Sequence, residues 1–404
     1  MSKLTASLVL LLLACKSKGE EEKQAPTVPV EVVRDAGAVD DASATPTAWP
    51  ELEGLPRAMP LREIVLPVRQ GVPRFEVGGP AIDGDIAAVA SSQLGFAGVA
   101  WRRGALAWTK PAGAHVAPPI VRDGSFVLIG DCVSPPEVPD GSMLLGCLRI
   151  VAPTGADQAY MAVHGKAKAV EEFAGSPGAQ EVWLDGERVR WRRGDAAVAI
   201  DVKSGVAVPA PAVRPVIVTY KDRTWAVTRE DDRLVARAGG KVAWQTEHEI
   251  TALLGTVWLP GQSPMIRIAN ASARGGAPEV RLLDIDATGS GHGQAAWTAV
   301  PGFQLLGQAI SPVGDVALAV RLDRNIKRDF IAAFAANALL IWVHPLPEVM
   351  RADPVGVAIA LDDEQAPEAV VVFHDGDTVT VLPPVSSPPT APGAARGPSQ
   401  NPTP

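Results

Sequence analysis

Hydrophobic and polar residues alternate with a period of two through the middle of the chain, in short runs that tight-turn residues separate. Alternation of this kind is typical of β-strands that bury one face. The clearest stretch predicts four consecutive strands, at Val216–Tyr220, Thr224–Thr228, Arg233–Arg237 and Lys241–Trp244. Between them we expect turns at Lys221-Asp222-Arg223, Glu230-Asp231-Asp232 and Gly239-Gly240. Four antiparallel strands so close in sequence make one sheet unit.

Asp-Gly pairs recur beside other apolar runs, at Asp83-Gly84, Asp123-Gly124, Asp185-Gly186 and Asp375-Gly376. They suit hairpin turns, which need positive backbone φ angles. No helical period of comparable strength appears. The best helix candidate, Arg328–Ala336, is short and Ala-rich and fits a strand and loop equally well. The sequence therefore predicts an all-β fold.

A Gly-x-x-x-Trp marker repeats along the chain, at Gly104/Trp108, Gly240/Trp244 and Gly293/Trp297, with a degenerate copy that ends at Trp342. The last three Trp residues of the marker, Trp244, Trp297 and Trp342, are 53 and 45 residues apart. This is the spacing of one propeller blade. The Gly allows a tight turn, and we expect the Trp to cover the edge between adjacent sheets. Sheets with two apolar faces must stack into a closed ring.

Three segments resemble the quinoprotein-type β-propeller, the repeat shared by pyrroloquinoline quinone dehydrogenases and by the propeller lipoprotein of the outer-membrane barrel assembly machinery. Gly104–Trp108 followed by Ala117–Gly124 matches its G-x-x-x-W and P-P-x-V-x-D-G run. Leu283–Gly289 resembles its L-D-x-x-T-G hairpin, and Ala199–Gly205 is a third copy, with Pro209 where Trp belongs. The resemblance implies a single β-propeller of four-stranded antiparallel blades. Its span predicts seven blades, with six or eight also allowed.

The N-terminus carries an export signal, because Lys3 precedes an apolar run that ends in Leu12-Leu13-Ala14-Cys15. These four residues resemble the lipobox of bacterial lipoproteins, which implies lipid on Cys15 after cleavage before it. The alternative is an ordinary secretory signal with an incidental Cys. Lys16, not Asp, follows Cys15, which by the same resemblance favours the outer membrane. We expect a cell-envelope protein whose only link to the membrane is this lipid.

Composition divides the chain into four parts. Residues 1–14 are the predicted signal peptide, and 15–60 are a tether rich in Pro, Ala, Asp and Thr that buries too little apolar surface to order itself. Residues 61–382 are the predicted propeller, and the Pro-rich stretch 383–404 is a disordered tail. Beyond Leu13, no segment has the ~20 apolar residues of a membrane-spanning helix.

Cys132 and Cys147 flank one loop rich in Pro and Gly. In an oxidising compartment such a pair predicts a local disulfide. The alternatives are two free buried thiols or a redox couple. A quinone-binding site of this propeller family typically has two adjacent Cys. Because Cys132 and Cys147 are not adjacent, we expect no cofactor.

The formal net charge of −8 argues against a nucleic-acid partner, which calls for a basic face. The six His are scattered without ligand spacing, so we expect no metal site. No nucleophile elbow or catalytic triad is apparent. The sequence thus favours no enzymatic reaction.

Two near copies place paired arginines at expected strand ends, as Trp101-Arg102-Arg103-Gly104 and Trp191-Arg192-Arg193-Gly194. Arg102, Arg103, Arg192 and Arg193 could line one face and bind an acidic protein or glycan. The simpler interpretation, which we favour, is that they are solvated blade tips.

The sequence favours a lipid-anchored, monomeric propeller that acts as a non-catalytic scaffold for other envelope proteins. The alternative is a ligand-binding or hydrolytic propeller that acts on envelope glycan or peptide. Convergent carboxylates or a metal in the central funnel would favour that alternative. An apolar funnel would favour the scaffold.

Overall fold

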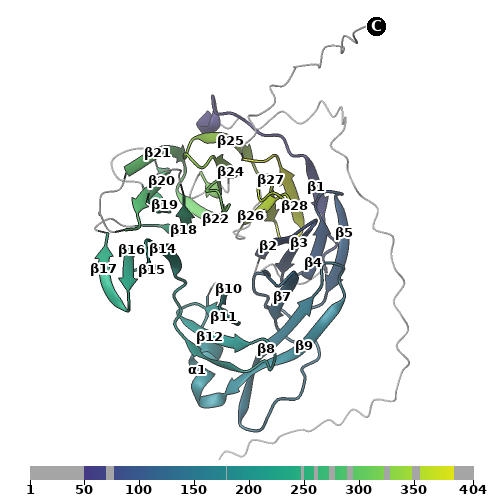
Figure 1. The fold of residues 1–404 in the computed structure, drawn as a ribbon. Helices are drawn as coiled ribbons and strands as arrows, with labels where there is room; N and C mark the ends of the chain where they lie inside the picture. The colour runs from purple at the N-terminus through teal and green to yellow at the C-terminus, as the bar shows by residue number, and fades with distance from the viewer. Residues whose placement is uncertain are drawn as a thin grey trace, which may run out of the picture. The chain divides into compact units, whose positions relative to one another are not determined.

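The computed structural model describes residues 50–69, 77–178, 180–246, 250–258, 263–272, 278–288, 294–322, 328–347 and 355–385. Within them, seven four-stranded antiparallel sheets form a ring, so the fold is a seven-bladed β-propeller (Figure 1). Each sheet is one blade, and we number the blades I to VII from the first complete one. The predicted fold class is confirmed.

The first three blades each use four consecutive strands. Blade I contains β2 (Val77–Asp83), β3 (Ile86–Ser91), β4 (Gly95–Ala100) and β5 (Ala105–Lys110). Blade II contains β6 (Ile120–Arg122), β7 (Ser125–Gly130), β8 (Ser142–Val151) and β9 (Asp157–Lys166). After the helix α1 (Ala167–Gly175), blade III contains β10 (Gln180–Asp185), β11 (Arg188–Arg193), β12 (Ala196–Asp201) and β13 (Ala207–Ala210).

Blades IV to VI repeat this order. Blade IV contains β14 (Val216–Tyr220), β15 (Arg223–Glu230), β16 (Arg233–Ala238) and β17 (Lys241–Gln245). Blade V contains β18 (Ala252–Val257), β19 (Met265–Ser272), β20 (Glu279–Asp286) and β21 (Gln294–Pro301). Blade VI contains β22 (Gln304–Ile310), β23 (Val316–Arg321), β24 (Asp329–Phe334) and β25 (Leu340–Pro345).

Blade VII closes the ring with strands from both ends of the described chain. It contains β26 (Gly356–Leu361), β27 (Pro367–His374) and β28 (Thr378–Leu382), and its fourth strand is β1 (Arg62–Val65). β1 pairs antiparallel with β28, with Arg62 opposite Val381. Hydrogen bonds between two distant segments thus close the ring.

Blade IV is the sheet unit that the alternating pattern predicts. Its three hairpin turns are Lys221-Asp222, Asp231-Asp232 and Gly239-Gly240, and both residues of every turn have positive φ. Two-residue turns of this kind match the right-handed twist of the flanking strands. The predicted turns are therefore present, and their residues have the backbone angles that such turns require.

The Ala-rich segment Arg328–Ala336 is a strand, β24, and the one α-helix of the described residues is α1. β24 lies inside blade VI and is packed on both sides. Phe330 and Phe334 contact the core between blades V and VI, whereas Ile331 lies in the core between VI and VII. A strand buried on both faces is apolar throughout, which removes the alternation that identifies other strands.

The packed part of the chain extends beyond the expected 61–382. A short 3-10 turn, η1 (Pro50–Leu52), precedes β1. Leu52 is fully buried between blades V and VI, and Ala58 is buried between VI and VII. At the other end Val385 is fully buried in the same VI–VII core.

Glycines let the innermost strands of three blades approach closely. A Cβ on Gly307 of β22 would lie 2.0 Å from the Val355 carbonyl oxygen, just before β26. A Cβ on Gly356 of β26 would lie 1.6 Å from the Gly79 carbonyl oxygen in β2. No larger residue fits at these positions without moving a backbone, so blades VI, VII and I are held tightly at the centre.

Hydrophobic clusters fill six of the seven boundaries between blades, as far as the described residues show. Each cluster combines side chains from two neighbouring sheets, as between blades II and III or IV and V. The boundary between blades III and IV, which we call the III–IV boundary, has no such cluster. The ring is therefore least well filled at that boundary.

Candidate functional site

A pocket of about 830 Å³ opens where the innermost strands of blades III to VI begin. We call it the channel-mouth pocket. Its lining comes from β10, β14, β18 and β22, from the loop before β14, and from the ends of β11 and β15. It lies beside the III–IV boundary, because blades III and IV supply about half of its wall.

Leucines line one wall of the channel-mouth pocket. Leu253-Leu254-Gly255 of β18 and Leu305-Leu306-Gly307 of β22 are equivalent segments of neighbouring blades. Both strands shift register at the same step, between the first Leu and the Gly. A β-bulge re-aims side chains at such a step, and here both leucines of each strand line the pocket. The Gln308 side-chain amide donates to the Leu253 carbonyl oxygen at 3.2 Å and ties the two strands together.

Charged side chains form the rim of the channel-mouth pocket. The Arg192 guanidinium donates to Glu181 at 2.7 Å, and Arg229 pairs with Asp232. Arg214 is exposed, and no described residue forms an ion pair or hydrogen bond with its guanidinium. Exposed ion pairs contribute only ~0–1 kcal/mol each. A partner can therefore replace these pairings at little cost.

Three tryptophans connect a blade to the next one. The indole N–H of Trp108 donates to the Pro153 carbonyl oxygen at 3.1 Å, from blade I to blade II. Trp244 donates to Ala287 at 3.2 Å, from IV to V, and Trp342 donates to Pro384 at 3.2 Å, from VI to the end of VII. Each Trp lies in the fourth strand of its blade, and each acceptor follows the third strand of the next blade.

The Gly of the marker turns the chain tightly before these tryptophans. Gly104 and Gly240 both have positive φ, at 70° and 78°. Gly293 and the side chain of Trp297 lie outside the described residues. Blade III has Pro209 in its fourth strand, β13, so no indole crosses the III–IV boundary from that position.

Exposed apolar side chains remain where blades III and IV face each other. Ile217 and Val242 of blade IV stand in one row of the sheet and are 57% and 56% exposed. Val208 of blade III is 40% exposed. The III–IV boundary therefore lacks both a hydrophobic cluster of described residues and an indole that crosses it.

The two arginine pairs do not share a face. Arg102 and Arg103 lie in the hairpin between the third and fourth strands of blade I, whereas Arg192 and Arg193 lie at the hairpin between the second and third strands of blade III. In an antiparallel blade, successive hairpins alternate between the two faces of the ring. These hairpins therefore lie on opposite faces of the ring, and the two arginine pairs do not form the common face that was the alternative to solvated blade tips.

The individual arginines have different surroundings. Arg102 donates from Nε to Glu368 of blade VII at 2.8 Å and also pairs with Asp85. The hydrogen bond that Arg102 donates to Glu368, together with the charge of Asp85, raises the pKa of the Arg102 guanidinium above its ordinary value. Arg193 lies over the rings of Trp191 and Phe173. Arg103 is exposed, and Arg192 belongs to the rim of the channel-mouth pocket.

The remaining sequence predictions concern the cysteines, metal binding and membrane spans. A disulfide joins Cys132, just after β7, to Cys147 in β8. Cys15 lies outside the described residues, as do the predicted signal peptide and most of the tether and tail. In the described part of the chain, no His, Cys, Asp and Glu side chains gather in a group that could hold a metal ion. No described helix is long and apolar enough to cross a membrane.

Sequence reasoning missed the channel-mouth pocket, although one signal for its leucine wall was present. Leu-Leu-Gly occurs three times, at 144–146, 253–255 and 305–307, and the last two copies are one blade apart. A repeated triplet at blade spacing marks equivalent positions in two blades. Of the charged rim, the sequence singled out only Arg192, in the Trp191–Gly194 copy, because the other rim residues come from separate hairpins.

No protein-family model and no curated protein sequence matches this chain. Solved structures with a similar fold include BamB from Moraxella catarrhalis, which is 12% identical, with a TM-score of 0.40 over 81% of this chain and 99% of that one. BBS1N in complex with ARL6DN is 12% identical, with a TM-score of 0.45 over 83% and 99%. The C-terminal WD40 domain of Sif2 is 11% identical, with a TM-score of 0.40 over 77% and 81%. Similarity this distant carries no argument about function.

Proposed function

We propose that this protein is a lipid-anchored envelope β-propeller that acts as a non-catalytic scaffold and holds a partner protein at the channel-mouth pocket. The observation that carries the proposal is the pocket itself, with its wall of four leucines inside a rim of arginines and carboxylates. Protein interfaces have this anatomy, with an apolar centre surrounded by polar residues, and they are enriched in Arg.

The position of the pocket supports a protein partner. Four blades contribute to its lining, and the III–IV boundary beside it leaves Ile217 and Val242 exposed. A partner that enters the channel mouth can also cover these side chains. Removing such apolar surface from water favours association by about 25 cal/mol for each Å², and part of this gain offsets the entropic cost of binding.

The anchor is the second half of the proposal. Leu12-Leu13-Ala14-Cys15 supports lipid on Cys15, and Lys16 supports an outer-membrane location. The residues between Cys15 and the first packed residue, Leu52, make up most of the predicted tether. A flexible chain of that length has a reach of roughly 30–35 Å. The propeller could then meet partners without itself touching the bilayer.

Site-specific photo-crosslinking in intact cells tests the partner. A photoreactive amino acid replaces Leu306 in the pocket or, as a matched control, Leu339, which is 59% exposed in a hairpin of the same blade. We expect a discrete crosslinked protein from position 306 and not from 339. The partner proposal fails if 306 yields none or if both positions yield the same products.

Membrane fractionation tests the anchor independently. Cys15→Ser removes the thiol that would carry the lipid, so we expect the variant in the soluble envelope fraction with an unchanged propeller by circular dichroism. Labelling with radioactive palmitate should disappear in parallel. A variant that stays in the membrane would refute the anchor but leave the crosslinking result intact.

A further inference from the structure

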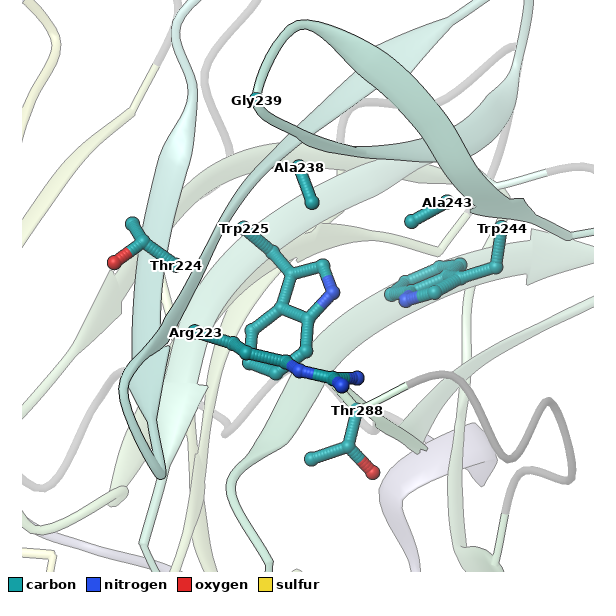
Figure 2. A pocket seen from close by; sticks show the side chains of 8 residues that line it. All are labelled: Arg223, Thr224, Trp225, Ala238, Gly239, Ala243, Trp244 and Thr288. Carbon is teal, nitrogen blue, oxygen red and sulfur yellow. The ribbon is translucent and has the colours of Figure 1, made fainter.

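A second pocket, of about 510 Å³, lies away from the channel mouth on the outer part of blade IV (Figure 2). We call it the rim pocket. Its walls are Trp225 of β15 and Trp244 of β17, its base includes Arg223, and Thr288 reaches it from blade V. Its volume is within the usual range of small-molecule sites, roughly 300–1,000 Å³.

The first donor of the rim pocket is the indole N–H of Trp225. Trp225 is only 5% exposed, yet no described residue accepts a hydrogen bond from its Nε1. Figure 2 shows this nitrogen on the side of the ring that faces Trp244. The N–H of Trp244 is already used, because it donates to the Ala287 carbonyl oxygen. The N–H of Trp225 has no acceptor among the described residues and faces the pocket, so a ligand in the pocket can accept its hydrogen bond.

The second donor is the guanidinium of Arg223. It extends past the indole of Trp225 toward Thr288 (Figure 2) and has no ionic or hydrogen-bonding partner in the described part of the chain. The neighbouring polar groups are occupied. Thr224 shares a hydrogen bond with Thr219, and the Thr288 hydroxyl donates to the Asp286 carboxylate. Among the described side chains of the pocket, the donors without a partner are thus the guanidinium of Arg223 and the N–H of Trp225.

We propose that the rim pocket binds a small carboxylate attached to a six-membered ring. A guanidinium recognises a carboxylate through two parallel N–H donors, and the N–H of Trp225 supplies a third donor nearby. The two indoles offer flat apolar walls for the ring. The positive charge of Arg223 disfavours a cationic ligand. The ring can be aromatic or that of an acidic sugar, since both present the same carboxylate.

Nuclear magnetic resonance of the full chain with ¹⁵N-labelled Trp tests this site. The probes are benzoate and glucuronate, each compared with a neutral counterpart, benzamide or methyl glucoside. We expect at least one acid to shift the indole N–H signal that Trp225→Phe removes, and the neutral compounds to leave it in place. The acid that binds identifies the ring. A signal that neither acid moves, or that the neutral counterpart moves equally, overturns the proposal.

Two arginine variants show whether the binding is specific to the pocket. Arg223→Gln should weaken binding about tenfold or more, because a hydrogen bond to a charged group is lost. Arg233→Gln is the matched control, since Arg233 is an exposed arginine of the same blade outside the pocket. Both changes are at exposed positions, and equal melting temperatures would confirm that both variants fold. Equal affinity in the two variants would refute the role of Arg223.

Discussion

At the scale of single residues, Arg267 is a buried charge whose guanidinium makes hydrogen bonds within its own blade and to the next one. It is fully buried, and Nε and one terminal nitrogen donate to the two oxygens of Asp284 at 2.7 and 2.6 Å. Both terminal nitrogens also donate across to blade VI, to the carbonyl oxygens of Gly314 and Ala336, each at 2.7 Å. A buried charge is tolerated when it is paired and its remaining donors are used. Arg267 therefore joins blades V and VI through polar contacts, in addition to their apolar core.

Arg267→Met should lower the free energy of unfolding by about 3–5 kcal/mol, because Asp284 would remain buried without its partner. Urea denaturation followed by circular dichroism measures the change. Arg103→Met, at an exposed position, is the control and should have little effect. Replacing Asp284 with Leu in the Arg267→Met background should recover much of the loss. If the double variant is no more stable than the single one, the penalty does not come from the orphaned carboxylate.

At the scale of strands and hairpins, the contact that recurs is the bond from an indole in the fourth strand to the next blade. The three described examples join residues that are 45, 43 and 42 positions apart, close to one blade length. The tryptophans differ in burial, and Trp342 is fully buried between blades VI and VII. The same local marker thus forms the same contact between blades in three places.

Trp342→Phe should destabilise the protein by about 2 kcal/mol, because the Pro384 carbonyl oxygen loses its donor and the smaller ring leaves space in the core. Trp258→Phe is the matched control, since Trp258 is 49% exposed and belongs to no core cluster of the described residues. Thermal unfolding of the two variants measures the difference. Equal melting temperatures would mean that the indole contact contributes nothing beyond apolar area.

At the scale of the whole ring, neighbouring blades are not packed equally well at every boundary. Blades VI, VII and I approach so closely that glycine is needed at their inner strands, and hydrophobic clusters fill the boundaries on both sides of blade VII. The III–IV boundary has neither a cluster among the described residues nor an indole, and Pro209 leads into a connection that contains Pro211 and Pro215. Local opening begins where the fewest apolar contacts must be broken.

Amide hydrogen exchange should therefore be faster in β14, next to the III–IV boundary, than in β26 of blade VII. Both are innermost strands of their blades, so their depth in the ring is comparable. Mass spectrometry of peptides that cover Val216–Tyr220 and Gly356–Leu361 measures the two rates. Equal protection in the two peptides would show that the III–IV boundary is as stable as the rest of the ring.

The sequence by itself determined the strands, their turns and the repeat. These features depend on neighbouring residues, since alternation fixes which side chains face a core and residues such as Asp231-Asp232 set the backbone of a two-residue turn. The Gly-x-x-x-Trp marker indicated a blade because its members lie on one hairpin. β24 was ambiguous, because a strand buried on both faces has no polar side.

Only the tertiary structure decided where the sites lie. Arg102 pairs with Glu368, 266 positions away, and the channel-mouth pocket combines side chains from four blades. The closing strand β1 and the III–IV boundary likewise depend on which distant segments meet. Closing the ring brings these segments together, and periodicity along the chain contains no information about such contacts. The local fold was thus determined by short-range patterns, whereas the pockets arise from the packing of whole blades.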